Sequence, residues 1–243
     1  MGFFGRFAPQ DDDGGGKMDG VKVKICGITN VEDAVVACHC GADLIGFVFV
    51  AGTSRCVDRE IVKEIISGEP GKFKGKVISV GLFKDETIER AGEIVHYSGI
   101  GSVQFHGAES PEYCGDFKKF MMKEYGIGEI KVIKAFKVKK EILPSGVYRP
   151  EDYDTVDYFV FDTFHPFRDG GTGIGFDHEV LKANREKLKK PFFIAGGLNA
   201  ENVKEVVRNV RPFGVDVSSG IEKNVGMKDK KLLKEFILNA KNA

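Results

Sequence analysis

The chain has 243 residues, 42% of them hydrophobic, and its 36 basic side chains balance its 36 acidic ones. The zero net charge argues against a nucleic-acid partner, since such proteins usually carry a basic excess. The chain has no secretory signal pattern and no apolar run near the roughly 20 residues that span a bilayer, so we expect a soluble cytoplasmic protein without a membrane partner.

The first 20 residues differ in composition from the rest of the chain. The run from Asp11 to Gly16 is charged and rich in glycine, so it offers little apolar surface to bury. We predict a disordered N-terminal extension over residues 1–20, followed by a single folded catalytic domain over residues 21–243.

From Val21 onward, short apolar runs alternate with stretches in which apolar residues recur at helical spacing. Nearly continuous runs of Val, Ile and Phe are typical of parallel strands covered on both faces. The predicted strands are Val21–Ile25, Leu44–Phe49, Val77–Leu82, Gly101–Gln104, Lys131–Ala135, Tyr158–Phe161, Phe192–Ala195 and Gly214–Val217. The predicted helices are Val31–Cys40, one containing Ile61, Ile65 and Ile66, Ile88–Tyr97, Tyr113–Tyr125, Val180–Leu188, Val203–Val210 and Lys231–Ala240. The connection Val138–Asp157 is the least regular, and no full helix is expected there.

Eight strands alternating with helices predict an α/β fold, a closed (β/α)₈ TIM barrel, which typically takes about 250 residues. The alternative is an open doubly wound sheet, which predicts a glycine fingerprint after its first strand. The residues there are Cys26-Gly27-Ile28-Thr29, which do not match it. In a TIM barrel, catalytic groups lie at the carboxyl ends of the strands, so the residues at those ends are the candidates for function.

Two strands end in side chains able to move protons. Cys26 follows the first strand, where its thiolate could act as a nucleophile or base; the alternative is a buried, inert cysteine. Asp162 follows the sixth strand, and an unpaired buried carboxylate is costly; the alternative is a cap of the following loop.

Glycine- and serine-containing loops follow the last two strands, where many barrels hold a phosphate group. Glycines allow a close backbone approach, and exposed N–H groups at a helix start attract anions. We therefore predict a phosphate site at Gly196, Gly197, Ser218, Ser219 and Gly220. Gly170-Gly171-Thr172-Gly173 is a third such loop, which either closes over a ligand or is a simple turn.

Two further side chains are candidates for contact with a substrate. Arg55, after the second strand, is a suitable cation for an anionic ligand, although most arginines lie on the surface. His106, after the fourth strand, could contact substrate or could be a structural histidine.

Five cysteines without an export signal indicate reduced thiols rather than a disulfide framework. Cys38-His39-Cys40 lies in a helical pattern, where successive side chains point about 100° apart and cannot converge on one ion. We therefore predict no metal site.

The motifs of this chain resemble those of phosphoribosylanthranilate isomerases, enzymes of tryptophan biosynthesis. The resemblance runs from about Val21 to the C-terminus, and it departs at Val50-Ala51-Gly52, where an aromatic residue and a proline are usual. The matching segments, in chain order, are Lys24-Ile25-Cys26-Gly27-Ile28-Thr29, Gly41-Ala42-Asp43, Gly46-Phe47-Val48-Phe49, Ser54-Arg55, Val103-Gln104-Phe105-His106-Gly107, Asp162-Thr163, Gly170-Gly171-Thr172-Gly173, Phe176-Asp177, Ala195-Gly196-Gly197-Leu198 and Val215-Asp216-Val217-Ser218-Ser219-Gly220-Ile221-Glu222.

The resemblance implies an Amadori rearrangement of N-(5-phosphoribosyl)anthranilate to 1-(o-carboxyphenylamino)-1-deoxyribulose 5-phosphate. It implies that Asp162 is the general acid that opens the ribose ring and Cys26 the general base that removes the C2 proton. Arg55 and Asp216 would help hold the anthranilate and ribose portions, and no cofactor would be needed.

Two alternatives remain open at the level of sequence. One is another phosphate-binding barrel isomerase, such as the related histidine-pathway enzyme, which has an Asp where this chain has Cys26. The other is a catalytically silent barrel that binds a phosphorylated ligand. The oligomeric state is not predicted.

Overall fold

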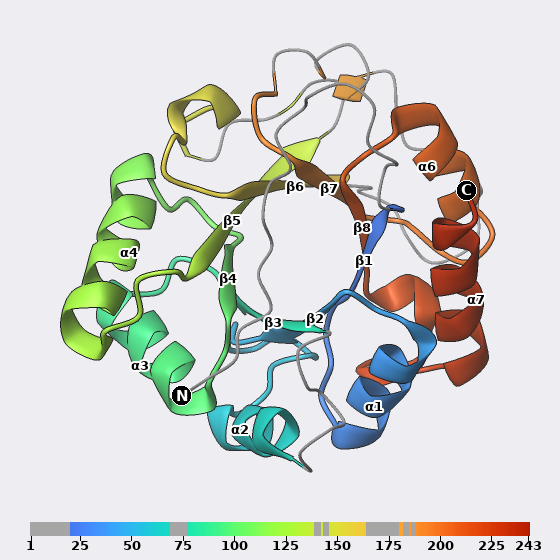
Figure 1. Ribbon diagram of the computed structural model, residues 1–243, viewed down its shortest axis with the longest axis horizontal. Helices are drawn as coiled ribbons and strands as arrows, with labels where there is room; N and C mark the ends of the chain where they lie inside the picture. Colours follow the sequence, from blue (N-terminus) through green and yellow to red (C-terminus); the bar gives the residue numbers. More distant parts are fainter. Residues whose placement is uncertain are drawn as a thin grey trace.

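The computed structural model describes residues 20–68, 77–138, 142, 146–163, 180–181, 185 and 188–243. Eight parallel strands close into a barrel in chain order, with β1 paired to both β2 and β8 (Figure 1). The strands are β1 Lys22–Ile25, β2 Leu44–Val48, β3 Ile78–Phe83, β4 Ser102–Phe105, β5 Lys131–Val138, β6 Tyr158–Thr163, β7 Phe192–Ala195 and β8 Gly214–Val217.

Helices surround the barrel on its outer side (Figure 1). They are α1 Val31–Cys40, α2 Arg59–Ser67, α3 Ile88–Ser98, α4 Pro111–Tyr125, α6 Val203–Val210 and α7 Lys230–Lys241. The predicted (β/α)₈ barrel is confirmed. Residues 1–19 of the predicted extension over residues 1–20, the loop Gly170–Gly173 and most of the helix predicted over Val180–Leu188 lie outside the described residues.

Local sequence signals explain where the helices begin and end. At α1, the Asn30 side chain accepts a hydrogen bond from the backbone N–H of Asp33, which caps the first turn. The helix ends at Gly41, whose φ of 95° lies in the left-handed region that favours glycine. In the irregular connection before β6, the described residues contain a short 3₁₀ helix, η1 Pro150–Asp152.

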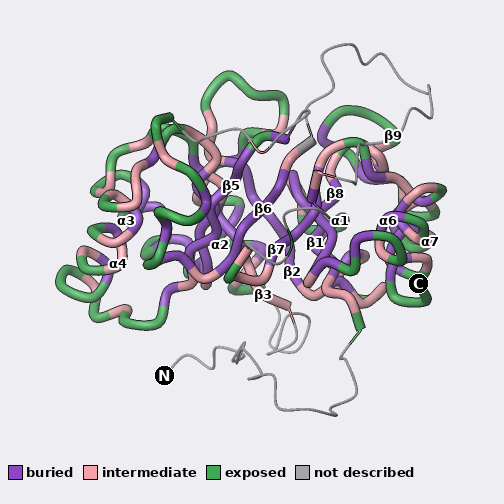
Figure 2. Tube along the Cα trace, turned by 90° about the horizontal axis from the view of Figure 1, so that it is seen from above, coloured by how far each residue is buried: buried purple, intermediate pink, exposed green. Residues whose placement is uncertain are grey.

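The strands separate two apolar cores, and the buried residues follow them through the centre of the molecule (Figure 2). The larger core lies between strands and helices, and the smaller one lies inside the barrel. Strand β6 shows how alternation divides them. Phe159 and Phe161 join the outer core, while Tyr158 and Val160 join the inner one. Asp162 is the next residue on the inward face after Tyr158 and Val160. It therefore lies at the carboxyl end of the barrel, beyond the apolar interior.

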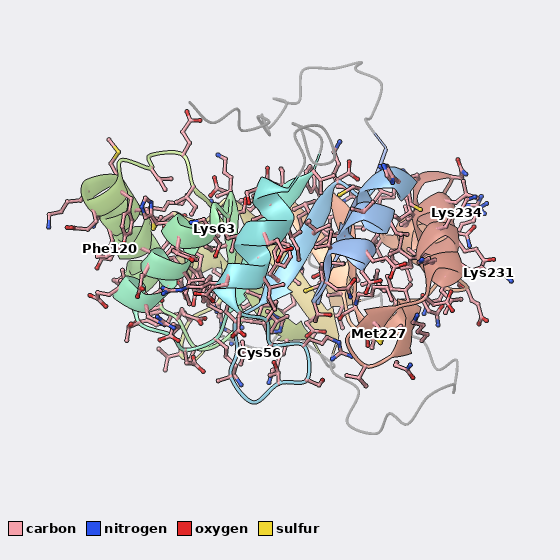
Figure 3. The ribbon with its side chains drawn as sticks, turned by 90° about the horizontal axis from the view of Figure 1, so that it is seen from below. Cys56, Lys63, Phe120, Met227, Lys231 and Lys234 are labelled. Atoms are coloured by element: carbon pink, nitrogen blue, oxygen red, sulfur yellow. The ribbon has the colours of Figure 1, made fainter. Side chains whose placement is uncertain are left out.

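A short hairpin of β9 Glu222–Asn224 and β10 Met227–Lys228 follows β8, joined to it by the 3₁₀ helix η3 Ser219–Ile221. The sequence did not predict this hairpin. It lies beside the β2–α2 loop. A Cβ atom at Gly226 of the hairpin would be 3.5 Å from the carbonyl oxygen of Ser54 in that loop, which shows how close the two segments are. Cys56 in that loop and Met227 in the hairpin lie on the same edge of the molecule (Figure 3).

No helix among the described residues combines the length and the apolar character that crossing a membrane requires.

Candidate active site

A cavity of about 320 Å³ opens among the carboxyl ends of the barrel strands. Its lining residues belong to β2, β3, β4, β6, β7 and β8 and to the segments that follow β1, β2, β4, β7 and β8. The ten residues predicted from the sequence all line it: Cys26, Arg55, His106, Asp162, Gly196, Gly197, Asp216, Ser218, Ser219 and Gly220. The fold thus brings together groups that are up to about 190 residues apart in the chain, as between Cys26 and Asp216.

Cys26 sits beside a fully buried ion pair. The side chain of Lys24 is 0% exposed, and its Nζ donates to Oδ2 of Asp216 at 2.7 Å. The pairing crosses the seam of the barrel, where Lys24 on β1 lies opposite Asp216 on β8. Burial alone would lower the pKa of Lys24, but the negative charges of Asp216 and of ionised Cys26 raise it. Lys24 is therefore an ammonium ion next to the thiol.

The Cys26 thiol is protonated in the unliganded protein. Burial raises its pKa, and the neighbouring cations Lys24 and Lys228 act in the opposite direction without outweighing the burial. A further positive charge nearby would favour ionisation of the thiol, because an opposite charge close by stabilises a thiolate in a dry site.

Gly46 on β2 leaves the space that the sulfur occupies. A Cβ at this position would lie 2.9 Å from Sγ of Cys26 and 3.3 Å from Nζ of Lys24. Real Cβ atoms essentially never approach other atoms as closely as 2.9 Å, so any side chain here would displace the thiol.

Asp162 is in contact with His106 across the cavity. Nε2 of His106 lies 3.2 Å from Oδ2 of Asp162, and Nδ1 lies 3.0 Å from Nε2 of Gln104. Asp162 is 34% exposed and His106 is 24% exposed, as measured on their side chains. The carboxyl group is therefore open to a ligand as well as to the imidazole.

Arg55 reaches the cavity but is already held by a carboxylate. Its Nε and Nη2 donate to the two oxygens of Glu222 at 2.7 and 2.6 Å. Lys228 donates to the same carboxylate at 3.0 Å. Burial alone would raise the pKa of Glu222, but the two cations hold it lower. Two positive charges facing one negative charge leave this side of the cavity with a net positive charge.

The loops after β7 and β8 are locked against each other. Gly196 and Gly197 have φ of 83° and 67°, in the left-handed region that favours glycine. A Cβ at Gly220 would lie 1.9 Å from the Leu198 carbonyl oxygen, so only glycine fits there. The glycines predicted as an anion-binding rim thus have two separate structural requirements, backbone conformation and close approach.

Three buried polar atoms that line or adjoin the cavity have no hydrogen-bond partner among the described residues: Oδ1 of Asp216, Oγ of Ser218 and Oε1 of Gln104. An unsatisfied buried polar group costs about 1–3 kcal/mol. Their presence together at one cavity indicates that a ligand with hydroxyl or similar polar groups completes them.

The sequence prediction missed Lys24, Gly46, Gln104 and Glu222. The signal for Lys24 and Gln104 was strand alternation, since each lies two residues before a predicted site residue and therefore shares its face. For Glu222 and Gly46 there was no local signal, because their partners, Arg55 and Cys26, are 167 and 20 residues away in the chain.

The sequence was compared with protein-family models and with known proteins. Residues 23–239 match the model of N-(5'-phosphoribosyl)anthranilate (PRA) isomerase. The chain is 39% identical over 221 residues to the N-(5'-phosphoribosyl)anthranilate isomerase of Desulforudis audaxviator, covering 91% of this chain and 98% of the relative.

Solved structures give the same result. The phosphoribosyl anthranilate isomerase of Thermotoga maritima superposes with a TM-score of 0.75 at 35% identity, covering 92% of this chain and all of that one. A phosphoribosyl anthranilate isomerase in complex with reduced 1-(o-carboxyphenylamino)-1-deoxyribulose 5-phosphate has a TM-score of 0.72 at 34% identity, over the same shares of the two chains. With the barrel, its cavity and the family model in agreement, this chain belongs to the N-(5'-phosphoribosyl)anthranilate isomerase family.

Proposed function

We propose that Asp162 and Cys26 carry out the two proton transfers of the reaction that this isomerase catalyses. That reaction converts N-(5'-phosphoribosyl)anthranilate to 1-(o-carboxyphenylamino)-1-deoxyribulose 5-phosphate, an aldose–ketose rearrangement of tryptophan biosynthesis. The observation that carries the assignment is that a carboxyl group and a thiol, from β6 and β1, line one cavity beside a rim suited to an anion. We also propose that residues 21–243 form the catalytic domain and that the enzyme is cytoplasmic.

Asp162 acts first in this proposal. Opening the ribose ring requires a proton on the ring oxygen, and a carboxyl group within reach of the cavity can donate it. Opening produces a cationic iminium at C1, conjugated with the anthranilate ring. The order matters because this cation is the extra positive charge that the buried thiol lacks in the unliganded protein.

Cys26 then loses its own proton to solvent at the cavity that it lines, and its thiolate removes the proton from C2. The Lys24 ammonium and the iminium both favour the thiolate over the thiol. The resulting enolamine tautomerises to the ketone, which completes the rearrangement. Acid and base belong to different strands, so they approach the sugar from different directions.

Three groups would hold the substrate. The Arg55 cation is suited to the anthranilate carboxylate, and the unpartnered Oδ1 of Asp216 is suited to a ribose hydroxyl. The phosphate would lie at Gly196, Gly197, Ser218, Ser219 and Gly220, where Oγ of Ser218 has no partner in the described part of the chain. His106, predicted as a substrate contact, lines the cavity and contacts Asp162.

The test is the loss of fluorescence as phosphoribosylanthranilate is consumed by the purified protein. Removing either proton-transfer group should lower kcat by about 10²- to 10⁴-fold, so Cys26→Ala and Asp162→Asn are each expected to be nearly inactive. Cys38→Ala is the matched control, because Cys38 lies on α1 and does not line the cavity. Wild-type rates in Cys26→Ala or Asp162→Asn would refute the assignment of these two roles.

A further inference from the structure

The imidazole of His106 lies between two polar side chains from different strands. Gln104 contacts its Nδ1 at 3.0 Å, and Asp162 contacts its Nε2 at 3.2 Å. Gln104 and His106 are two residues apart, so both side chains point toward the cavity that they line. Glutamine, imidazole and carboxylate therefore form one row of contacts that ends at the proposed acid.

Counting hydrogens decides how this row is arranged. Before Asp162 is protonated for its role as the acid, its carboxylate can only accept, so Nε2 of His106 carries the hydrogen of that contact. A neutral imidazole has one N–H, which leaves Nδ1 with a lone pair that needs a donor. The amide nitrogen of Gln104 is that donor. The glutamine therefore selects the tautomer in which the imidazole hydrogen faces Asp162.

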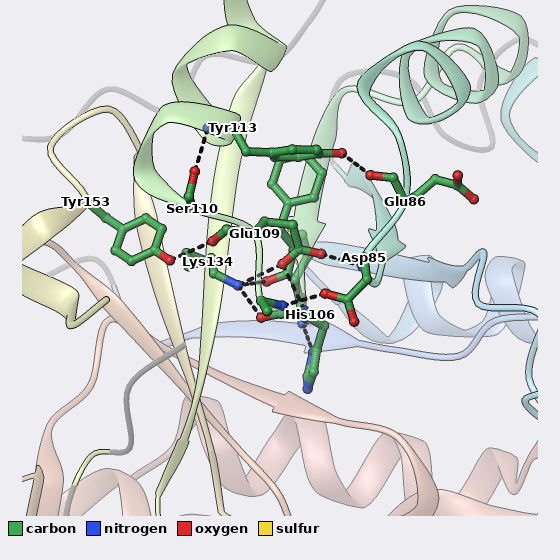
Figure 4. A network of polar contacts seen from close by, with 12 residues as sticks. Asp85, Glu86, His106, Glu109, Ser110, Tyr113, Lys134 and Tyr153 are labelled. Carbon is green, nitrogen blue, oxygen red and sulfur yellow. Dashed lines mark hydrogen bonds and ion pairs between the residues drawn. The ribbon is translucent and has the colours of Figure 1, made fainter. Parts of the chain in front are cut away.

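The backbone that carries His106 is held from behind by a buried ion pair. Nζ of Lys134 donates to the carbonyl oxygens of Phe105 at 3.3 Å and of Gly107 at 2.8 Å, and to Oε2 of Glu109 at 2.8 Å. The Lys134 and Glu109 side chains are 0% and 1% exposed. Figure 4 shows this network converging behind His106. With both flanking carbonyls fixed, the ring stays aimed at the cavity.

A purely structural role does not explain an amide at position 104. Gln104 is 1% exposed, and its Oε1 has no partner in the described part of the chain. An apolar side chain of similar size would avoid that cost. The hydrogen bond of the amide nitrogen to His106 gives the side chain a use that an apolar residue could not supply.

We propose that Gln104 is a positioning residue for Asp162, acting through His106, whose tautomer it fixes. The inference rests on the proposed role of Asp162 as the general acid. By holding the hydrogen of His106 on Nε2, the glutamine keeps the carboxyl group of Asp162 in one orientation toward the ribose.

The first test measures, by ¹⁵N NMR of the resting enzyme labelled with ¹⁵N-histidine, which ring nitrogen of His106 carries the hydrogen. The His106 signals are identified by their absence in His106→Asn. We expect an unprotonated Nδ1 and a protonated Nε2. In Gln104→Glu an acceptor faces Nδ1, so both ring nitrogens should become protonated. A wild-type ring with its hydrogen on Nδ1, or an unchanged ring in Gln104→Glu, would overturn the proposal.

The second test uses turnover. Gln104→Met keeps the size of the side chain and removes the donor, and we expect kcat to fall about tenfold with little change in KM. In a His106→Asn background the same substitution should have no further effect, because the glutamine acts through the imidazole. Ser79→Ala is the control. It removes one neutral hydrogen bond, which the backbone N–H of Gly101 donates to Oγ of Ser79 at the end of the barrel opposite the cavity.

The two proposals fail in different ways. If Asp162→Asn retains full activity, the proposed acid is wrong, whatever the ring spectrum shows. If Asp162→Asn is inactive but Gln104→Met has wild-type kcat, or lowers it equally with and without His106, the assignment of Asp162 stands and the role of Gln104 is wrong. Should Gln104→Met fail to fold, the nearly isosteric Gln104→Glu still decides the question through the ring spectrum.

Discussion

Lys24 shows how one residue can set the chemistry of another. Its ammonium group has no exposed surface, pairs with Asp216 and adjoins the sulfur of Cys26. A lysine is seldom fully buried unless it is paired, and a buried pair contributes little net stability relative to apolar residues of the same size. The presence of this pair is better explained by its effect on the thiol than by its effect on the fold.

We expect Lys24→Met to lower kcat at least tenfold by removing a cation that favours the Cys26 thiolate. Alkylation of Cys26 by iodoacetamide, followed on its own peptide by mass spectrometry, should require a higher pH than in the wild-type enzyme. Lys22→Met is the control on the same strand, since Lys22 is partly exposed and lies 3.9 Å from Asp43. Unchanged alkylation in Lys24→Met would show that the ammonium group does not act on the thiol.

Much of the site was predictable from single residues, and the reason is positional. Cys26, His106 and Asp162 each stand at or just beyond the end of an apolar strand, so the barrel prediction alone placed them at one rim. What Arg55 contacts was not predictable, because its partner Glu222 lies 167 residues away in an unpredicted hairpin. The pKa shifts of the site residues could not be predicted from the sequence either, since they depend on burial and on charges from other strands.

At the scale of elements, all eight strands were predicted because each is a short, mostly apolar run that is covered on both faces. Strands β5 and β6 extend beyond their predicted ends, to Val138 and Thr163. The extra residues pair with each other, so the partner strand and not the local composition sets these ends. The β9–β10 hairpin escaped prediction because its residues are mostly polar and its pairing is very short.

Asp157, the residue before β6, links that strand to α4 and β5 at the amino end of the barrel strands. It accepts hydrogen bonds from Lys118 on α4 at 2.7 Å, and from Lys131 and the backbone N–H of Val132 on β5 at 3.1 and 2.9 Å. Burial alone would raise the pKa of Asp157, but the ion pairs and the backbone hydrogen bond outweigh it and hold that pKa below its ordinary value of 3.8.

A carboxyl group whose pKa is lower in the folded state stabilises the fold above its unfolded pKa, and that stability is lost as the pH falls through the folded value. We therefore expect Asp157→Asn to reduce the free energy of unfolding by about 2 kcal/mol at pH 7. In urea titrations the difference from wild type should shrink steadily below about pH 4.

Asp116→Asn is the control for this substitution, because its ion pair with Lys119 is exposed and such pairs contribute little. A difference between Asp157→Asn and wild type that stays the same from pH 7 to pH 3 would contradict the assignment of the ionised carboxylate as the stabilising form.

For the molecule as a whole, the cavity joins strands from both halves of the barrel. A ligand there contacts β1, β4, β6, β7 and β8 or their loops at once, so it stabilises the folded state without affinity for the unfolded chain. At 100 times its Kd such a ligand contributes about 2.7 kcal/mol, which corresponds to a rise in Tm of about 5–10 °C for a domain of this size.

We expect this rise with reduced 1-(o-carboxyphenylamino)-1-deoxyribulose 5-phosphate, measured by calorimetry. Ser219→Glu should abolish it by adding a negative charge at the proposed phosphate rim, whereas the neutral, equally large Ser219→Gln should retain most of it. Ser219 is exposed, so neither substitution strains the fold. Equal rises in both variants would mean that the phosphate binds elsewhere.

The contact between Gly220 and the Leu198 carbonyl oxygen makes the rims contributed by β7 and β8 a single mechanical part. Lengthening or exchanging one loop alone would remove the contact that holds the other loop in place. Attempts to redirect this barrel toward new phosphorylated compounds should therefore transplant both loops together and vary the β2–α2 loop separately, since Arg55 links that loop to the hairpin through side chains.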